Sequence, residues 1–253
     1  MPGWFRRTST VCWWPNGGYA MAAMRHAHEY GSTAAQRARV VVDQRLNALG
    51  VVPGVDAGLT VEDVLASSLV CDPFHSLEIV RPVTGAAAFV VAGAPGRHPR
   101  VRVAGAGERT DHAGIAQARS LSTSNIVHTA VAAFTQAGIR PAGIDVLEVY
   151  DCYTITVLPA LEDAGFCAKG SVGPFVAEHD LTWCGDLPVN TNGGQLNTGQ
   201  AGYAGGATHL VQAVRQLRGT AAHQVPDCAT AFVHGNGGTL THECSLVLTR
   251  EDA

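Results

Sequence analysis

The stretch IDVLEVYDCYTITVLPALEDAG, residues 144–165, carries the clearest structural signal in the sequence. Residues 144–149 are mostly aliphatic and fit a short buried strand. Residues 154–165 then fit a helix, in which Pro159 is expected to kink the axis or to end the first part. Four polar and aromatic residues separate the two segments. A buried strand that leads into a helix predicts an α/β fold.

The rest of the chain alternates in the same way. Helices are expected over residues 18–30, 34–49, 61–67, 125–137 and 207–218, and Thr60 is a candidate cap for the third. Strands are expected over residues 85–93, 100–108, 228–235 and 244–251, the last two joined by a hairpin-like turn at Asn236-Gly237. Residues 166–200 are expected to form a long loop, and residues 1–14 match no element. The sequence therefore predicts a layered α/β protein.

The composition excludes several classes of protein. The chain has 253 residues with a net charge of −4, and so lacks the basic character of nucleic-acid-binding proteins. Its seven cysteines contain no CxxC pair, which argues against a disulfide framework and a ribbon-type zinc site and favours a reducing, cytoplasmic location. No apolar run reaches the roughly 18 residues of a membrane span.

The segment NTNGGQLNTGQAGYAGG, residues 190–206, is rich in glycine and leads directly into the predicted helix 207–218. Such a segment suggests a phosphate cradle, but it matches neither GxxxxGK[ST] nor GxGxxG after a strand. Glycines also allow tight turns and close approach of the backbone to a neighbouring element. We therefore do not expect a nucleotide site here.

Two kinds of chemistry remain open for the loops at the ends of the elements. Cys152 follows a strand and precedes a helix whose N-terminus can lower the pKa of a thiol, but no histidine is nearby, so a buried structural thiol is favoured. Tyr150, Tyr153 and Tyr203 also fall in these loops. A protonated phenol aimed at a carbonyl oxygen stabilises an enolate, although tyrosines are equally common at the edges of cores. His234 is a weaker candidate for ligand binding.

These motifs together resemble the thiolase superfamily. The segments EVYDCYTITVLPALEDAGFCAKG, GPFV, PVNTNGGQLNTGQAGYAGG and VHGNGGT are similar to its C-terminal half, and closest to the sterol-carrier-like thiolases called lipid-transfer proteins. The segments YAMAAMRHAHEYGST and LTVEDVLASSLVCDP resemble the end of the N-terminal domain and its loop region. The resemblance implies the layered αβαβα fold, with an incomplete N-terminal domain over residues 1–118 and a complete C-terminal domain over 119–253.

The chain departs from the family pattern at the chemically important positions. The segment that carries the nucleophilic cysteine of thiolases would precede residue 1, so we expect a truncated product or a misplaced start. The sequence Tyr150-Asp151-Cys152-Tyr153 stands where this branch carries HDCF, and Gln200 stands at the histidine of GHP. The turn at residues 234–238 has no cysteine where the family has its second one. Because Claisen chemistry needs a thiolate and a base, thiolysis is not expected.

The altered pattern resembles the steroid side-chain-cleaving aldolases of this superfamily. It implies a retro-aldol lyase that splits a β-hydroxyacyl-CoA of a steroid side chain into a ketone and a short acyl-CoA. Coenzyme A then belongs to the substrate, and no further cofactor or metal is expected. Tyr203 is the expected oxyanion donor or proton shuttle, with Tyr150 or Tyr153 as its partner, and Asp151 is expected to orient backbone at the start of a helix. The residues assigned to substrate binding are Asp151, Gly199, Gln200, His234 and Asn236.

The resemblance also implies a homodimer and a small zinc-ribbon/OB-fold (DUF35) partner, which would hold any zinc. Two alternatives remain: a degenerate thiolase or acyl-CoA acyltransferase, and a non-catalytic acyl-CoA-binding subunit. If the chain is such a binding subunit, part of the sheet that is paired in the family fold would be left exposed.

Overall fold

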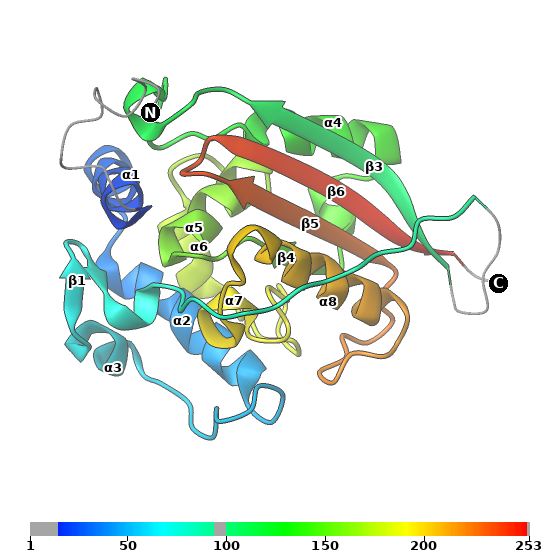
Figure 1. Cartoon of the computed structure of the whole chain (residues 1–253), viewed down its shortest axis with the longest axis horizontal. Helices are drawn as coiled ribbons and strands as arrows, with labels where there is room; N and C mark the ends of the chain where they lie inside the picture. The colour runs from blue at the N-terminus through cyan, green and yellow to red at the C-terminus, as the bar shows by residue number, and fades with distance from the viewer. Residues whose placement is uncertain (1–14, 94–99, 252–253) are drawn as a thin grey trace.

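A four-stranded mixed sheet forms the centre of the computed structural model, which describes residues 15–93 and 100–251 (Figure 1). The strands lie in the order β3 (Arg100–Thr110), β6 (His242–Glu251), β5 (Thr230–Gly237) and β4 (Val146–Val149). Strand β4 runs parallel to β5, whereas β6 is antiparallel to both of its neighbours. The predicted α/β class, these four strands and the hairpin of β5 and β6 are confirmed. The turn of this hairpin lies at residues 238–241, whereas the predicted turn residues Asn236 and Gly237 belong to β5 and pair with β6. Residues 1–14 lie outside the described part.

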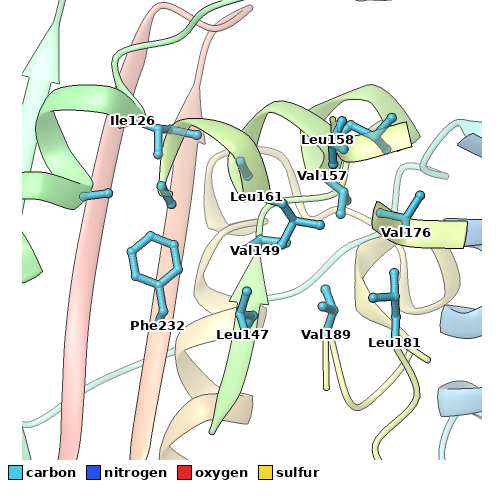
Figure 2. Packing of buried hydrophobic residues seen from close by; sticks show 14 of the residues in the cluster. Ile126, Leu147, Val149, Val157, Leu158, Leu161, Val176, Leu181, Val189 and Phe232 are labelled. Carbon is cyan, nitrogen blue, oxygen red and sulfur yellow. The ribbon is translucent and has the colours of Figure 1, made fainter. Parts of the chain in front are cut away.

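Helices cover both faces of the sheet. Helices α4 (Ile126–Ala137) and α5 (Thr154–Asp163) pack on one face, and α8 (Ala207–Leu217) packs on the other. Phe232 of β5 lies in the first of these cores, and its neighbour Val233 lies in the second, as the alternation of side chains along a strand requires. Figure 2 shows the first core, with Leu147 and Val149 of β4 beneath Leu161 of α5. Because β4 is buried on both faces, its end is a rigid place for a site.

The remaining helices surround α5. Helix α2 (Ala34–Ala48) packs against α5, α6 (Val172–Glu178) and α7 (Gly194–Thr198), and α1 (Pro15–Tyr30) also contacts α5. Helix α3 (Val61–Ala66) starts with the predicted cap, because Thr60 and Asp63 form a reciprocal capping box. Within the described residues no helix is both long and apolar enough to cross a membrane. The short elements are β1 (Leu69–Cys71), β2 (Phe74–His75), η2 (Ser76–Glu78), η3 (Ile115–Gln117), η4 (Pro141–Gly143) and η5 (Gly202–Ala204).

Two predictions about secondary structure are wrong. Residues 166–200, expected to be loop, contain α6 and α7, which are too short to show a helical period in the sequence. Residues 85–93, expected to be a strand, are extended but pair with no strand in the described parts of the chain. Figure 1 shows this segment passing α7 and α8 on its way to β3. Its residues have the composition of a strand, but no strand in the described parts of the chain lies in register beside them.

The unpaired segment 85–93 is apolar and exposed. Val90 is 96% exposed and Val91 is 90% exposed, and Phe89 is also exposed. An extended, apolar segment with free backbone groups is a template for pairing with another chain. We expect the purified chain to self-associate through this segment. Because each valine buried on association contributes about 1.5–3 kcal/mol, the double change Val90→Ser/Val91→Ser should weaken self-association at least about tenfold.

Sedimentation equilibrium over a range of concentrations measures this effect. Val131→Ser is the matched control, because Val131 is an exposed valine on a helix, where no backbone groups are free to pair. A wild-type chain that stays monomeric at high concentration would contradict the prediction, as would equal effects of the two changes.

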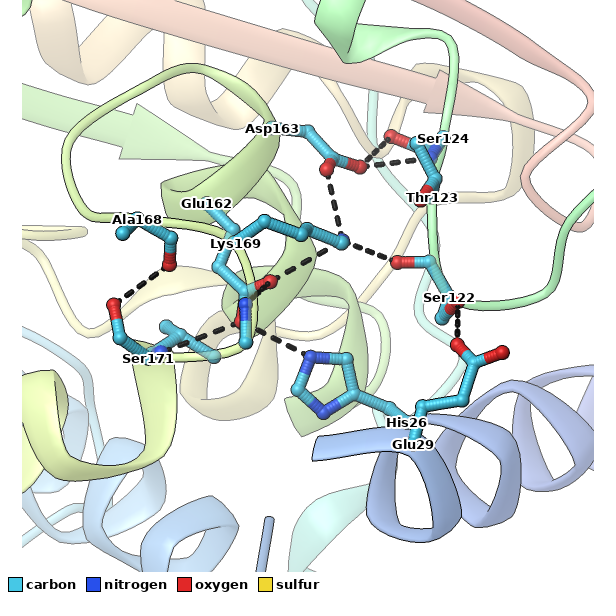
Figure 3. Close-up of polar contacts among 12 residues, drawn as sticks. His26, Glu29, Ser122, Thr123, Ser124, Glu162, Asp163, Ala168, Lys169 and Ser171 are labelled. Atoms are coloured by element: carbon cyan, nitrogen blue, oxygen red, sulfur yellow. Dashed lines mark hydrogen bonds and ion pairs between the residues drawn. The ribbon is translucent and has the colours of Figure 1, made fainter. Parts of the chain in front are cut away.

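A buried ion network joins α1 to the end of α5. Figure 3 shows Lys169 between the carboxylates of Glu162 and Asp163, with its Nζ atom 3.2 Å and 2.9 Å from their oxygens. Glu162 also lies 3.1 Å from Nε2 of His26 and accepts the backbone N–H of Gly170. Burial alone would raise the pKa of Glu162, but these hydrogen bonds and the ammonium of Lys169 lower it to about 2. The network therefore stabilises the ionised carboxylate in the folded state.

Glu162 should stabilise the fold in a pH-dependent way. Its pKa is lower in the folded chain than in the unfolded one, where it is about 4.3, so its contribution is complete above that pH and is lost as the pH falls toward 2. The contribution is on the order of 2–3 kcal/mol at pH 7. Glu162→Gln should lower the free energy of unfolding by about that amount at pH 7, by about half of it near pH 3 and by little near pH 2. Urea unfolding across this range measures it, with the exposed Glu178→Gln as control; a pH-independent difference would refute the assignment.

Candidate active site

A cavity of about 540 Å³ lies where the end of β4, the glycine-rich segment and the β5–β6 turn meet. Five of the eight predicted site residues line it: Tyr150, Tyr153, Gln200, Tyr203 and Asn236. Asp151, Gly199 and His234 are not on its wall. Tyr150, Gln200 and Asn236, which are between 36 and 86 positions apart in the sequence, thus meet at one concave surface, which is the usual setting of a small-molecule site.

Tyr150 follows the last residue of β4 and presents its hydroxyl to the cavity. The side-chain amide of Gln200 donates a hydrogen bond to that hydroxyl oxygen at 2.8 Å. Among the described residues no group accepts the phenol's own hydrogen, which leaves it available to a ligand. Burial, with smaller effects from the neighbouring Cys152 and Asp151, raises the pKa of Tyr150. The residue is therefore a neutral hydrogen-bond donor held in a fixed orientation.

Tyr153 is more fully engaged in the protein. Its hydroxyl donates to the side-chain oxygen of Asn16, and its ring stacks on Tyr19 with centroids 4.4 Å apart. Burial raises the pKa of Tyr153 as well. Because its hydroxyl hydrogen already has an acceptor, Tyr153 is a weaker candidate than Tyr150 for donation to a substrate.

Tyr203 lies in η5 and projects from the protein at the cavity's edge, where its side chain is fully exposed. Nearby, the backbone of Gln200 is fixed on both sides: its N–H donates to Arg81 O at 2.8 Å, and its carbonyl accepts from Val83 N at 3.0 Å. The segment thus offers one anchored side chain, Gln200, and one free phenol, Tyr203, at the same opening.

Cys152 lines the cavity but is not an activated nucleophile. The residue is 3% exposed, and burial raises the pKa of its thiol to about 12. At neutral pH the sulfur is therefore protonated, whereas a nucleophilic cysteine needs a lowered pKa. The prediction of a buried thiol is confirmed.

Asp151 holds backbone at the start of a helix. Its carboxylate accepts the N–H groups of Gln195 at 2.9 Å and Leu196 at 3.2 Å, which belong to α7. The expected orienting role therefore applies to α7, and not to α5, which follows Asp151 in the chain. A Cβ atom at Gly194, where φ is +61°, would lie 2.1 Å from Asp151 Oδ2, so only glycine allows this contact.

The two other predicted residues lie behind the cavity wall. His234 is fully buried, and burial together with the nearby charge of His209 lowers its pKa to about 3, so its ring is neutral. At Gly199 φ is +86°, and a Cβ atom there would lie 2.4 Å from a methyl carbon of Val83. Gly199 therefore lets residues 81–83 cross the glycine-rich segment. A role in substrate binding stays a prediction for both residues.

Tyr19 is a cavity residue that sequence reasoning missed. It lies on α1, and its hydroxyl donates to Gly238 O at 2.9 Å and accepts from the amide of Asn236 at 2.7 Å. These contacts connect α1 with the β5–β6 turn. No local pattern in residues 15–30 marks Tyr19, because its partners lie more than 200 positions away.

Comparison with known proteins places the chain in a family. Residues 107–250, more than half of the chain, match the model of the thiolase C-terminal domain-like family. The chain belongs to the thiolase C-terminal domain family. The expected superfamily and its thiolase-like α/β fold are thereby confirmed, whereas the predicted division after residue 118 stays a prediction. Strand β3, which precedes that point, pairs with β6 in the same sheet.

Three proteins that are similar to this chain differ in the activities that their names give. A steroid side-chain-cleaving aldolase from Thermomonospora curvata is 33% identical over 88% of this chain and 59% of its own length. An acetyl-CoA acetyltransferase from Methanothermobacter thermautotrophicus is 33% identical over 87% of this chain and 60% of its own. The solved Ltp2-ChsH2(DUF35) aldolase is 28% identical, with a TM-score of 0.81 over 95% of this chain and 64% of its own. The chain thus spans about three fifths of the length of the proteins that it matches.

Proposed function

We propose that the chain is a carbon–carbon lyase that cleaves a β-hydroxyacyl-CoA derived from a steroid side chain by a retro-aldol reaction. The observation that carries the proposal is the Tyr150–Gln200 hydrogen bond next to Tyr203 in a cavity whose two lining cysteines, Cys152 and Cys244, both have a pKa raised by burial. Among the described residues the cavity thus offers hydrogen-bond donors but no cysteine with a lowered pKa. The similarity to two proteins called aldolases supports the same reaction.

The proposed reaction is balanced without a further reactant. The substrate hydroxyl gives up its proton as its oxygen forms a ketone, and the bond between the α and β carbons breaks. The electron pair of that bond forms the enolate of a short acyl-CoA thioester. A proton returned to the α carbon completes the second product. Because one proton leaves and one returns, neither a redox cofactor nor an acyl-enzyme is needed.

Tyr150 and Tyr203 take separate roles in this reaction. The free hydrogen of Tyr150 donates to the thioester oxygen, which becomes negative as the enolate forms. Gln200 keeps the phenol in place, and the raised pKa of Tyr150 keeps it protonated. Tyr203, which no hydrogen bond in the described residues restrains, relays the proton from the substrate hydroxyl. Tyr153 is assigned to support of the cavity wall.

The proposal also includes a partner protein and the oligomeric state of the chain. One of the similar structures contains a DUF35 protein, which supports a partner of that kind for this chain. A homodimer is proposed from the family resemblance and is compatible with the exposed segment 85–93. Coenzyme A enters as part of the substrate.

One other function is favoured by a specific observation. The similarity to an acetyl-CoA acetyltransferase supports thiolase chemistry as the alternative. The two are separated by incubating the chain, alone and with a DUF35 partner, with a tertiary β-hydroxyacyl-CoA or with a 3-ketoacyl-CoA plus free CoA. The proposal predicts cleavage of the first substrate alone. Turnover of only the second would establish the acyltransferase, and binding of acyl-CoA without turnover of either would establish a binding subunit.

A further inference from the structure

A second buried histidine lies behind the cavity and is held by two carboxylates. His209 of α8 is 0% exposed. Its Nε2 atom lies 3.0 Å from Asp151 Oδ1, and its Nδ1 atom lies 3.7 Å from Glu148 Oε2. Both carboxylates are themselves fully buried. Charged groups so far from water are stable only when they are paired, and the geometry places one imidazole between two carboxyl groups. Burial raises the pKa of Glu148, while the nearby His209 and the hydrogen bonds from Thr191 oppose that rise.

Gln195 lies beside the same ring nitrogen. Its amide nitrogen is 3.1 Å from His209 Nε2, and its amide oxygen has no partner in the described residues. Because two donors cannot share a hydrogen bond, a protonated Nε2 requires the amide to be turned over, with its oxygen toward the ring. In that orientation the proton on Nε2 is shared by Asp151 and Gln195.

The electrostatic surroundings favour the same state. Burial would lower the pKa of His209, but Asp151 and Glu148 outweigh it and raise the pKa to about 9. The other titratable groups that face the ring are Tyr150, with ring centroids 6.2 Å apart, and His234, which is neutral. His209 is therefore a cation at neutral pH, in contrast to the equally buried His234.

The His209 cluster is joined to the cavity by two short paths. The first path runs through Asp151, whose carboxylate accepts hydrogen bonds from the backbone at the start of α7. Gln200 follows the last residue of α7 by two positions. The second path runs through Glu148, which accepts hydrogen bonds from the N–H and the hydroxyl of Thr191 at the start of the glycine-rich segment. Two points of the backbone that leads to Gln200, Thr191 and the start of α7, are thus tied to carboxylates that share one imidazolium.

We propose that His209 is a positioning residue, whose charge holds Asp151 and Glu148 and thereby fixes the glycine-rich segment and the Tyr150–Gln200 pair at the cavity. The expected effect on turnover rests on the proposed function, but the protonation of His209 and its effect on the glycine-rich segment do not. A neutral residue at position 209 would leave two buried carboxylates facing each other. The segment that contains α7 would then loosen, although no substrate contact is removed.

The structural part is tested without any assay of activity. In the wild-type chain, nitrogen NMR of the His209 ring should show protonation of both nitrogens at pH 7 and loss of one proton near pH 9. His209→Gln should increase hydrogen exchange across residues 190–203, because the N–H groups of Gln195 and Leu196 lose their fixed acceptor. The matched control is His234→Gln, which removes a neutral, unpaired ring. A neutral His209 at pH 7 overturns the proposal even if no variant folds, and so does equal exchange in the two variants.

The functional part is tested by the pH dependence of turnover. Wild-type kcat should fall as the pH rises through about 9, where His209 loses its proton. His209→Gln should lower kcat about 10- to 100-fold, since displacement of reacting groups by about 1 Å has effects of this size, while KM changes little. His128→Gln, which replaces an exposed histidine of α4 that does not line the cavity, should change kcat less than about threefold, within the effects of substitutions away from the site. Lyase activity that is unchanged in His209→Gln overturns the positioning role, whereas a wild-type chain with no lyase activity but a protonated His209 overturns only the proposed reaction.

Discussion

Tyr150→Phe is expected to lower kcat for retro-aldol cleavage by about 10²–10³-fold, the usual effect of removing one donor from an oxyanion site. The phenol of Tyr150 is oriented by Gln200, and its hydrogen is free for the substrate. Phenylalanine keeps the ring but leaves the developing enolate without this donor. Substrate binding should change little, because the charge on the thioester oxygen appears only during the reaction. Steady-state kinetics with a tertiary β-hydroxyacyl-CoA measures the effect.

Tyr153→Phe is the matched control for this prediction. Both tyrosines line the cavity, but the hydroxyl of Tyr153 is already bonded to Asn16. Its loss should therefore affect kcat only a few-fold and appear mainly as lower stability, by about 1 kcal/mol for one hydrogen bond. If Tyr153→Phe reduced kcat more than Tyr150→Phe, the roles of the two residues would have to be exchanged.

Tyr203→Phe is expected to lower kcat by about 10²–10⁴-fold, the range for a group that transfers a proton in the transition state. The side chain is fully exposed and has no hydrogen bond within the described residues, so the fold does not depend on it. The free energy of unfolding should stay within about 0.5 kcal/mol of the wild-type value. Kinetics and urea unfolding on the same preparation separate the two quantities.

Tyr30→Phe provides the control for Tyr203→Phe. Tyr30 is also partly exposed, but it lies at the end of α1 beside Lys169 and does not line the cavity. Its substitution should leave kcat unchanged. Full activity in Tyr203→Phe would exclude this residue as the proton shuttle and would leave Tyr150 without a partner.

The sequence predicted those parts of the fold whose pattern is local. The strand before Tyr150 and the helix after it were visible because burial on two faces selects aliphatic residues in one short run. The same reasoning failed for residues 85–93, because composition reports a preference for extended backbone and not the presence of a neighbouring strand. Val90 and Val91 have the side chains of a buried strand but are exposed.

The candidate site was predictable only where motifs were present. Tyr150, Gln200 and Tyr203 lie in segments that resemble the family, and the structure brings these segments to one cavity. Tyr19 also lies in a segment that resembles the family, but neither Tyr19 nor His209 was singled out, because each lies on a helix and its contacts are with residues of other elements. Tyr150 ranks above Tyr153 because of the hydrogen bonds of their hydroxyl groups, which cannot be deduced from the spacing of residues in the sequence.

Cleavage of a carbon–carbon bond without a cysteine intermediate can be followed in deuterium oxide. The chain, together with a DUF35 partner, is incubated with a tertiary β-hydroxyacyl-CoA, and products and intact protein are analysed by mass spectrometry. We expect equal amounts of ketone and short acyl-CoA, one deuterium on the α carbon of the acyl-CoA, and no change in protein mass. An acyl group on the protein, or products that form only when free CoA is added, would contradict it.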